Sequence, residues 1–571
     1  MRSAESPLPE VGDGSKRADP SPEGWTTWPR QGAPVSERDW GSQRARASLA
    51  TSAGIVAGAF VVSRVLGLVR EVVLARQFGT SEALSAYVSA FRIPDLLFLV
   101  IMAGAFGSAF IPVFSGYLAD GEDAAAWRLA SVVLNVSGIG VVVISALTWI
   151  AAPQLVALVV APGASAAAQE LTTETMRILL LSPVFLGFGI AAKGILEGQD
   201  RFTLPALAPI LYNGATILGA LLLGPSIGVQ GVAIGVVAGA FGFLLLQLPG
   251  VMRSGMRYSL SFDPRTPGVG EVARLLAPRL IGQAAFQINF IAVTNLAWQT
   301  GEQSVSALNY AWQLMMLPHG VLALSVSTVI LPTLSRLWQA DEIDAFRATL
   351  GGAMRPLIFL SLPAAVVLFA FRVPIVQTLF QTGAFSAEST AMVAAPLAFL
   401  AAGLVSYALV ETLTRAFYAM HDTRTPVIAG IVIIAINIGL GVALLDRLGY
   451  LGLALALSAS TTVEAVILAF VLARRIGPPA PGFRDWAARA IVATAVSGGV
   501  ALLLAPSLAE VTAPGTLPKV LQALVFVLAL AVVGAVFVVC AWMLRLPELA
   551  AMVGPVVRRV PGLRLLMEKS G

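Results

Sequence analysis

The sequence predicts an all-α membrane protein that crosses the bilayer about fourteen times. Three observations support this class: the composition, a series of long apolar segments, and basic residues in alternate loops. Of the 571 residues, 57% are hydrophobic and 12% are charged, and the mean hydropathy is +0.82. Soluble domains carry about 25% charged residues because their surfaces face water. The deficit extends over nearly the whole chain, so a large soluble core does not explain it.

Long apolar segments follow one another along most of the chain. A helix needs about 20 mainly apolar residues to cross the hydrocarbon core. The segments of suitable length are 49–78, 85–116, 127–151, 171–193, 203–223, 229–250, 271–299, 304–335, 350–371, 389–418, 426–446, 451–473, 486–505 and 519–544. Their even number places both termini on the same side of the membrane.

Basic residues gather in alternate loops. These loops carry Arg128, Lys193, Arg201, Arg253, Arg257, Arg265, Arg274, Arg336, Arg347, Arg415, Arg424, Arg474, Arg475 and Arg484. The intervening loops are nearly free of lysine and arginine, with Arg372, Arg447 and Lys519 as exceptions. Because short cytoplasmic loops are enriched in these residues, we expect a multi-pass membrane protein with both termini in the cytoplasm. Membrane topology thus accounts for the net charge of +5 without nucleic-acid binding.

The two tails and the rare residue types limit the chemistry further. Residues 1–47 are rich in Pro, Gly, Ser and charge, which predicts a disordered cytoplasmic tail, and residues 546–571 form a basic cytoplasmic tail suited to anionic lipid. With Cys540, His319 and His421 as the complete set of cysteines and histidines, neither a disulfide nor a metal site is expected. Nucleotide-binding and hydrolase motifs are also missing from the sequence. We therefore expect a secondary transporter without a cofactor, and not an enzyme.

Short motifs recur at an offset of about 215 to 221 positions. The pairs are Arg64-Val65-Leu66-Gly67 with Arg279-Leu280-Ile281-Gly282, Ser85-Ala86 with Ser306-Ala307, Ile111-Pro112-Val113-Phe114-Ser115 with Leu331-Pro332-Thr333-Leu334-Ser335, and Pro205 with Pro426. The repeat predicts two six-helix lobes, residues 48–260 and 261–475, related by a pseudo-two-fold axis along the membrane normal. A substrate site is expected between them. Two further helices in residues 476–545 fall outside the repeat.

Charged residues inside the first apolar segment are the strongest candidates for a binding site. A charge at membrane depth is costly unless it faces a cavity or a partner. Arg64 and Glu71 share one face of a helix, whereas Arg70 points roughly 120° from Arg64 and lies about 9 Å further along the axis. Two guanidinium groups could line a cavity for an anion such as phosphate, which suits their planar fork. A buried Arg–Glu pair, or side chains that reach the membrane interface, explains the same pattern.

Other polar residues also interrupt apolar segments. Arg92, Pro94 and Asp95 lie in the second segment, where the proline predicts a cavity wall, a hinge or a kink sealed by neighbours. Hydrogen bonds between helices explain most amides of the seventh and eighth segments, including Gln313. The residues that either bind a cation or pack between helices are Asn213, Asn437 and Glu464.

The first two segments resemble a known family. The motifs are Ser63-Arg64-Val65-Leu66-Gly67-Leu68-Val69-Arg70-Glu71, Ala75-Arg76-Gln77-Phe78-Gly79, Ala90-Phe91-Arg92-Ile93-Pro94-Asp95-Leu96-Leu97 and Gly104-Ala105-Phe106-Gly107-Ser108-Ala109-Phe110-Ile111-Pro112-Val113-Phe114. They are similar to the MurJ/MviN family of bacterial lipid II flippases, in the multidrug/oligosaccharidyl-lipid/polysaccharide exporter superfamily. The resemblance extends from about residue 48 to 545. It implies two lobes around a central cationic cavity, a groove for an undecaprenyl tail formed by the last two helices, and alternating access.

The resemblance also implies roles for individual residues. Arg64 and Arg70 match two cavity arginines of the family and would bind the pyrophosphate of the substrate. Glu71 stands where an acidic residue is usual. Arg92 and Arg279 are further candidates for the cavity or a gate.

Three positions depart from the family pattern. Phe98 and Gln313 stand where the family often has arginine, and Ala103 replaces an acidic residue. The cavity therefore keeps fewer of the expected charges. Gln313 remains a candidate for the cavity wall or a gate.

The expected substrate is an undecaprenyl-linked peptidoglycan precursor, flipped from the inner to the outer leaflet for cell-wall synthesis. Peptidoglycan synthases are expected partners, and the chain is expected to act as a monomer. A flippase for another polyprenyl-linked glycan would share this architecture. A cation-coupled drug antiporter should show an intramembrane acidic cluster, and a membrane glycan ligase should carry catalytic residues in a large outer loop. A scaffold for wall-synthesis enzymes that transports nothing is a further alternative.

Overall fold

The computed structural model describes residues 43–103, 106, 109–478 and 482–550. It forms two compact units, Met1–Gly54 and Ile55–Gly571, of which the first contributes only the start of one helix to the described residues. The regular structure of the described residues is helical throughout, without a β-strand. This confirms the predicted all-α class. A helix satisfies its own backbone hydrogen bonds, as the interior of a membrane requires.

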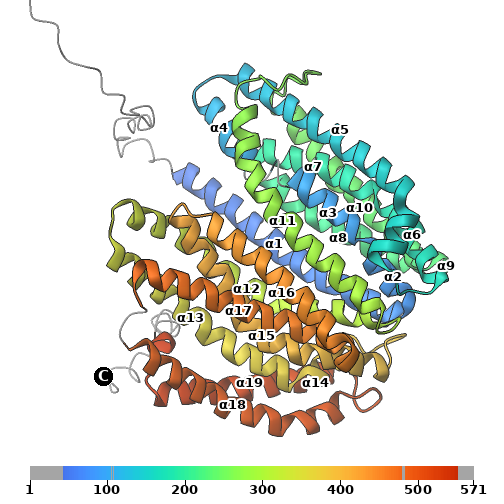
Figure 1. Cartoon of the computed structure of the whole chain (residues 1–571), viewed down its shortest axis with the longest axis vertical. Helices are drawn as coiled ribbons and strands as arrows, with labels where there is room; N and C mark the ends of the chain where they lie inside the picture. The colour runs from blue at the N-terminus through green and yellow to red at the C-terminus, as the bar shows by residue number, and fades with distance from the viewer. Residues whose placement is uncertain (1–42, 104–105, 107–108, 479–481, 551–571) are drawn as a thin grey trace, which may run out of the picture. The chain divides into compact units, whose positions relative to one another are not determined.

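The first half of the chain contains shorter helices as well as long ones (Figure 1). They are α1 (Gln43–Phe78), α2 (Glu82–Ala90), α3 (Arg92–Leu97), the π-helix η1 (Phe98–Ala103), α4 (Phe110–Ala119), α5 (Asp123–Leu155), the π-helix η3 (Val156–Val160), α6 (Ala166–Leu179), α7 (Leu181–Glu197), α8 (Thr203–Leu222), α9 (Gly224–Ile227) and α10 (Val229–Met252). The expected tails, 1–47 and 546–571, lie largely outside the described residues, although α1 already begins at Gln43.

The second half consists mainly of long helices. They are α11 (Val269–Trp298), α12 (Ser304–Gln339), α13 (Ile343–Ala370), α14 (Arg372–Leu379), α15 (Ala387–Ala419), α16 (Arg424–Leu448) and α17 (Tyr450–Ile476), followed by α18 (Phe483–Thr512) and α19 (Lys519–Met543).

Eleven helical stretches of the described residues are long and apolar enough to cross a membrane. The multi-pass character of the chain is therefore confirmed, while the number fourteen is not. The other three expected spans coincide with α1, α11 and α12, which have 36, 30 and 36 residues.

The expected span 85–116 is not one continuous helix. Instead, α2 ends at Ala90, and α3 and η1 follow after a break at Phe91. Pro94 has no N–H to donate to the carbonyl of Ala90, and its ring crowds that carbonyl, so a regular helix cannot continue. Short π-helices such as η1 are frequent at functional sites. The break gives Arg92 and Asp95 positions that a straight helix would not.

Helices pack mainly with partners from their own half. In the first half, α10 packs against α7 and α8, and in the second half α15 packs against α12, α13 and α17. The pair α18 and α19 contacts α13 and α14. Small residues allow the closest approach: a Cβ added to Gly219 of α8 would lie 2.5 Å from the Cα of Gly235 of α10.

The repeat seen in the sequence also appears in the backbone. Gly228 precedes α10 with a φ of 64°, and its counterpart Gly449 precedes α17 with a φ of 56°. Asp200, before α8, and its counterpart His421, before α16, both have a φ of 60°. Positive φ is uncommon for residues other than glycine. The same unusual conformation at corresponding positions supports the two-fold internal repeat.

Hydrogen bonds join the two halves where α2 and α12 begin. The Ser306 N–H donates to the Ser85 hydroxyl oxygen at 3.2 Å, and the Ser306 hydroxyl donates to the Thr80 carbonyl at 3.0 Å. The Thr80 hydroxyl lies 2.9 Å from that of Ser389, at the start of α15. Ser85 and Ser306 are fully buried and are counterparts in the repeat. Polar side chains thus seal this end of the interface.

The contact between α8 and α10 predicts a large effect of one methyl group. Gly219→Ala should lower the free energy of unfolding by about 1–3 kcal/mol, because the helices must separate to admit it. Thermal unfolding of the purified protein in detergent measures this change. Gly214→Ala on the same helix is the control, since a Cβ there meets nothing within 4 Å. Equal stability of the two variants would contradict the close packing.

Candidate functional site

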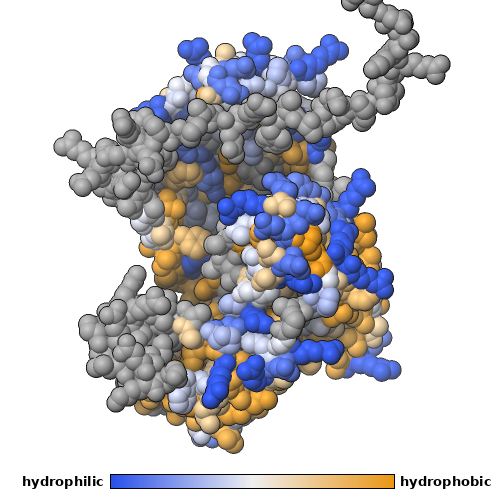
Figure 2. Space-filling model, turned by 90° about the vertical axis from the view of Figure 1, so that its left-hand side faces the viewer, coloured by the Kyte–Doolittle hydropathy of each residue, from blue (hydrophilic) through white to orange (hydrophobic). Residues whose placement is uncertain are grey.

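A cavity of about 490 Å³ lies between the two halves of the chain. Its walls come from α1, α2, α3, η1 and α8 on one side and from α11, α12, α15 and α17 on the other. The charged and polar lining residues are Arg70, Glu71, Tyr87, Arg92, Asp95, Tyr212, Gln287, Thr294, Asn309, Tyr310 and Gln313. The volume is typical of a ligand site. Figure 2 shows a recess in one face, in which hydrophobic and hydrophilic surface are both visible.

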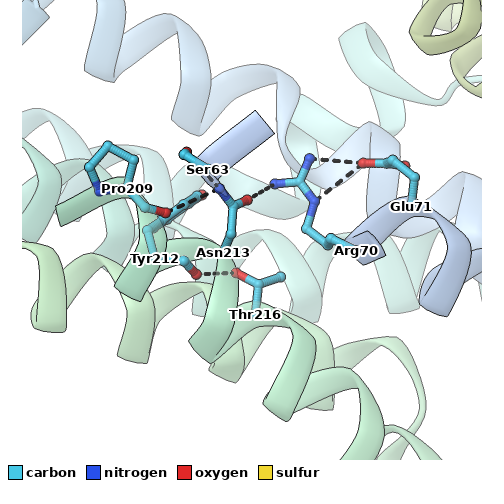
Figure 3. Close-up of polar contacts among 7 residues, drawn as sticks. All are labelled: Ser63, Arg70, Glu71, Pro209, Tyr212, Asn213 and Thr216. Atoms are coloured by element: carbon cyan, nitrogen blue, oxygen red, sulfur yellow. Dashed lines mark hydrogen bonds and ion pairs between the residues drawn. The ribbon is translucent and has the colours of Figure 1, made fainter. Parts of the chain in front are cut away.

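Arg70 is held by two neighbours in the wall of this cavity (Figure 3). Its Nε and Nη2 donate to the same carboxylate oxygen of Glu71, at 3.2 and 2.8 Å. Its Nη1 donates to the Oδ1 of Asn213 on α8, at 3.3 Å. Glu71 is only 8% exposed, so the ion pair satisfies a carboxylate that could not be buried alone. The sequence left open whether the arginines line a cavity or form a buried Arg–Glu pair. Arg70 does both, because it pairs with Glu71 and also lines the cavity.

Arg92 reaches across the cavity from the first half to the second. Its Nε donates to the Thr294 hydroxyl of α11 at 2.8 Å, and its guanidinium carbon lies 5.2 Å from the centre of the Phe290 ring. Asp95 lies one turn further along α3 and supplies a second carboxylate to the lining. Arg92 is thus engaged by the opposite wall.

The charges of the described lining balance. Arg70 and Arg92 are matched by Glu71 and Asp95, so the formal charges cancel. The resemblance implied a cationic cavity, and this lining is not cationic overall. An anion would therefore be bound by oriented N–H groups of the lining and not by a net positive charge.

Arg64 is placed differently from Arg70. It is exposed, stacks on Phe60 with its guanidinium carbon 5.2 Å from the ring centre, and does not line the cavity. A Cβ added to Gly320 of α12 would lie 3.4 Å from its Nη1. Among the described residues, Arg64 has no hydrogen bond or ion pair.

The remaining candidates have different outcomes. Gln313 lines the cavity, as expected for a position at its wall. Phe98 does not line it and packs against a separate apolar cluster. The side chains of Arg279 and Ala103 lie outside the described residues.

Three tyrosines of the lining were not predicted. Tyr87, Tyr212 and Tyr310 come from α2, α8 and α12. The buried hydroxyl of Tyr310 has no hydrogen-bond partner among the described residues. Aromatic residues are ordinary in apolar helices, so one sequence offers no signal that separates these from packing residues.

An all-α chain with repeated helix groups around an interior cavity with paired charges defines a polytopic membrane transporter. The model of one family, described as "Lipid II flippase MurJ", matches residues 74–523. The chain belongs to this family. The matched range begins after Arg70 and Glu71, so their roles depend on the geometry described above.

Individual relatives agree with this assignment. A lipid II flippase MurJ from Burkholderia cenocepacia is 32% identical over 466 residues, which cover 78% of this chain and 88% of that protein. The structure "Lipid II flippase MurJ, inward closed conformation" superposes with a TM-score of 0.71 at 23% identity, over 88% of this chain and 99% of that one. An inward-facing multidrug resistance MATE transporter has a TM-score of 0.65 at 19% identity, over 72% and 94% of the two chains. The structural matches establish the fold.

The bridge made by Arg92 predicts a loss of stability when it is removed. Arg92→Ala should lower the free energy of unfolding by about 1.5–3 kcal/mol, because Thr294 loses a charged hydrogen-bond donor and Asp95 loses its neighbouring cation. Thermal unfolding in detergent measures the change. Arg274→Ala, at an exposed position of α11, is the control and should change stability little. An equal effect of the two substitutions would show that the bridge contributes nothing.

Proposed function

We propose that this protein flips lipid II, the undecaprenyl-pyrophosphate-linked peptidoglycan precursor, from the inner to the outer leaflet of the bacterial cell membrane. Family membership and the 32% identity to the Burkholderia cenocepacia flippase support the substrate. The observation that carries the mechanism is Arg70, a guanidinium in the wall of a cavity shared by both halves. A guanidinium binds phosphate oxygens through two parallel N–H donors.

Arg64 and Arg70 act on the pyrophosphate in series. They lie on one helix, about 9 Å apart along its axis. Arg64 is exposed and has no hydrogen-bond partner in the described part of the chain, whereas Arg70 is partly buried in the cavity. Because Arg64 is the more exposed of the two, it contacts the pyrophosphate first, and Arg70 binds it deeper in the cavity.

Alternating access moves the headgroup across. The basic loops support cytoplasmic termini, and in that orientation the hydrogen-bonded end with Thr80, Ser85 and Ser306 faces outward. Transport breaks these bonds when the outer side opens. An inside-negative potential favours outward movement of an anion by about 2.3 kcal/mol per charge per 100 mV. Secondary energisation therefore suffices.

The undecaprenyl tail stays in lipid beside α18 and α19. These helices lie outside the internal repeat, and the apolar window of α19 has a mean hydropathy of 3.1 with 11% of its residues buried. This supports a division into lobes 48–260 and 261–475 and a tail-binding segment, 476–545. The protein acts as a monomer and supplies peptidoglycan synthases with substrate on the outer surface.

Complementation tests the roles of the two arginines. Arg64→Ala and Arg70→Ala should each fail to support growth of cells depleted of their own lipid II flippase, because the pyrophosphate loses a bidentate partner. Arg128→Ala, an exposed arginine of α5, is the matched control and should complement. Normal growth with both Arg64→Ala and Arg70→Ala would overturn the proposed site.

Reconstituted vesicles test the substrate. The purified protein should move labelled lipid II faster than a polyprenyl-linked O-antigen or exopolysaccharide unit, because the glycan and the peptide differ while the pyrophosphate is shared. Faster movement of the other glycan would identify the chain as a flippase for that lipid. No movement of either lipid would contradict a transport function.

A further inference from the structure

Asn213 lies directly behind the cavity wall. It is 9% exposed and is not a lining residue, whereas its neighbour Tyr212 is. Its Oδ1 accepts the hydrogen bond from Arg70 Nη1, at 3.3 Å (Figure 3). The contact ties α8 to α1 at the height of the proposed pyrophosphate site.

Contacts on the side of the Asn213 amide away from Arg70 fix the orientation of this amide. The Nδ2 of Asn213 donates to the carbonyl of Pro209, one turn earlier on α8, at 3.1 Å. It also lies within 3.5 Å of the Ser63 hydroxyl oxygen on α1. The Pro209 carbonyl can only accept, so it requires the nitrogen on that side and leaves the oxygen facing Arg70. The opposite orientation would bring N–H donors against the guanidinium.

A count of donors shows what the arrangement leaves free. A guanidinium has five N–H donors. Two donate to Glu71 and one to Asn213. Two remain, which is the number that a bidentate contact with one phosphoryl group requires. Arg70 can therefore bind the substrate while both of its neighbours stay in place.

The neutral charge of Asn213 matters as much as its position. Glu71 already supplies one negative charge to Arg70. A second carboxylate in place of the amide would leave the site net negative and repel a phosphate. An amide oxygen orients the guanidinium without this effect.

We infer that Asn213 is a positioning residue, which holds the Arg70 guanidinium with two N–H groups free for the pyrophosphate. This inference rests on the proposed function and adds a residue that does not touch the substrate. Through Asn213, α8 contributes to substrate binding, because the orientation of Arg70 depends on residues of both α1 and α8.

Binding of undecaprenyl pyrophosphate to the full-length protein in nanodiscs tests the inference. Asn213→Leu keeps the approximate volume but removes the acceptor, and should weaken binding about tenfold, as expected for the loss of an oriented charged hydrogen bond. In vesicles, KM should rise more than kcat falls. Asn135→Leu is the matched control, because Asn135 is buried to a similar degree but bonds to the backbone of residues 259 and 261. It should lower the unfolding temperature without changing affinity.

A double-mutant cycle with Arg70→Ala separates positioning from general damage. In that background, Asn213→Leu should have no further effect on binding, because it acts through Arg70. Asn213→Asp keeps an acceptor for Arg70 but adds a negative charge, and should therefore also bind weakly. Unchanged affinity of Asn213→Leu, or an undiminished effect in the Arg70→Ala background, would overturn the inference, as would normal binding by Asn213→Asp. If Arg70→Ala alone bound the lipid normally, the proposed site itself would fail.

Discussion

The need to neutralise buried charge governs the cavity of this protein. Ions inside an apolar helix bundle must be paired or hydrogen-bonded, since an isolated charge there is too costly. Arg70 is accordingly bonded to Glu71, and Arg92 crosses to Thr294 with Asp95 nearby. The described lining of the cavity carries no net formal charge, yet it retains N–H donors that are already oriented. The protein can thus hold a guanidinium within the membrane, as the proposed pyrophosphate site requires, without the penalty of an unpaired cation.

Much of the fold follows from the sequence, because the membrane leaves few alternatives. Long apolar segments must be helices, and their loops reveal a repeated pattern. The site follows less completely. Helical periodicity separates Arg64 from Arg70 by roughly 120°, which predicts that they face different surroundings. Helical periodicity cannot identify the residues that surround each arginine. The structure turns Arg70 toward Asn213 of α8 and leaves Arg64 beside Gly320 of α12, contacts between residues that are distant in the sequence.

The second expected span shows where sequence reasoning loses precision. Hydropathy averaged over residues 85–116 remains high across the break at Phe91, so it predicts one helix. Pro94 was the informative residue, since its missing N–H is a local defect that averaging conceals. The same segment explains the departure at Phe98. This side chain belongs to η1, packs among apolar neighbours and does not line the cavity, so an apolar residue suits the position.

The hydrogen bond between Ser85 and Ser306 bears on the origin of the chain. A residue that touches its own counterpart lies beside the axis relating the two halves. In an ancestral homodimer of six-helix chains, this serine would have met its own copy across a true two-fold axis, in an isologous interface. Fusion of the two copies would have freed each side to change independently. The descendants of that one helix now differ, since α2 stops at Ala90 whereas α12 continues to Gln339.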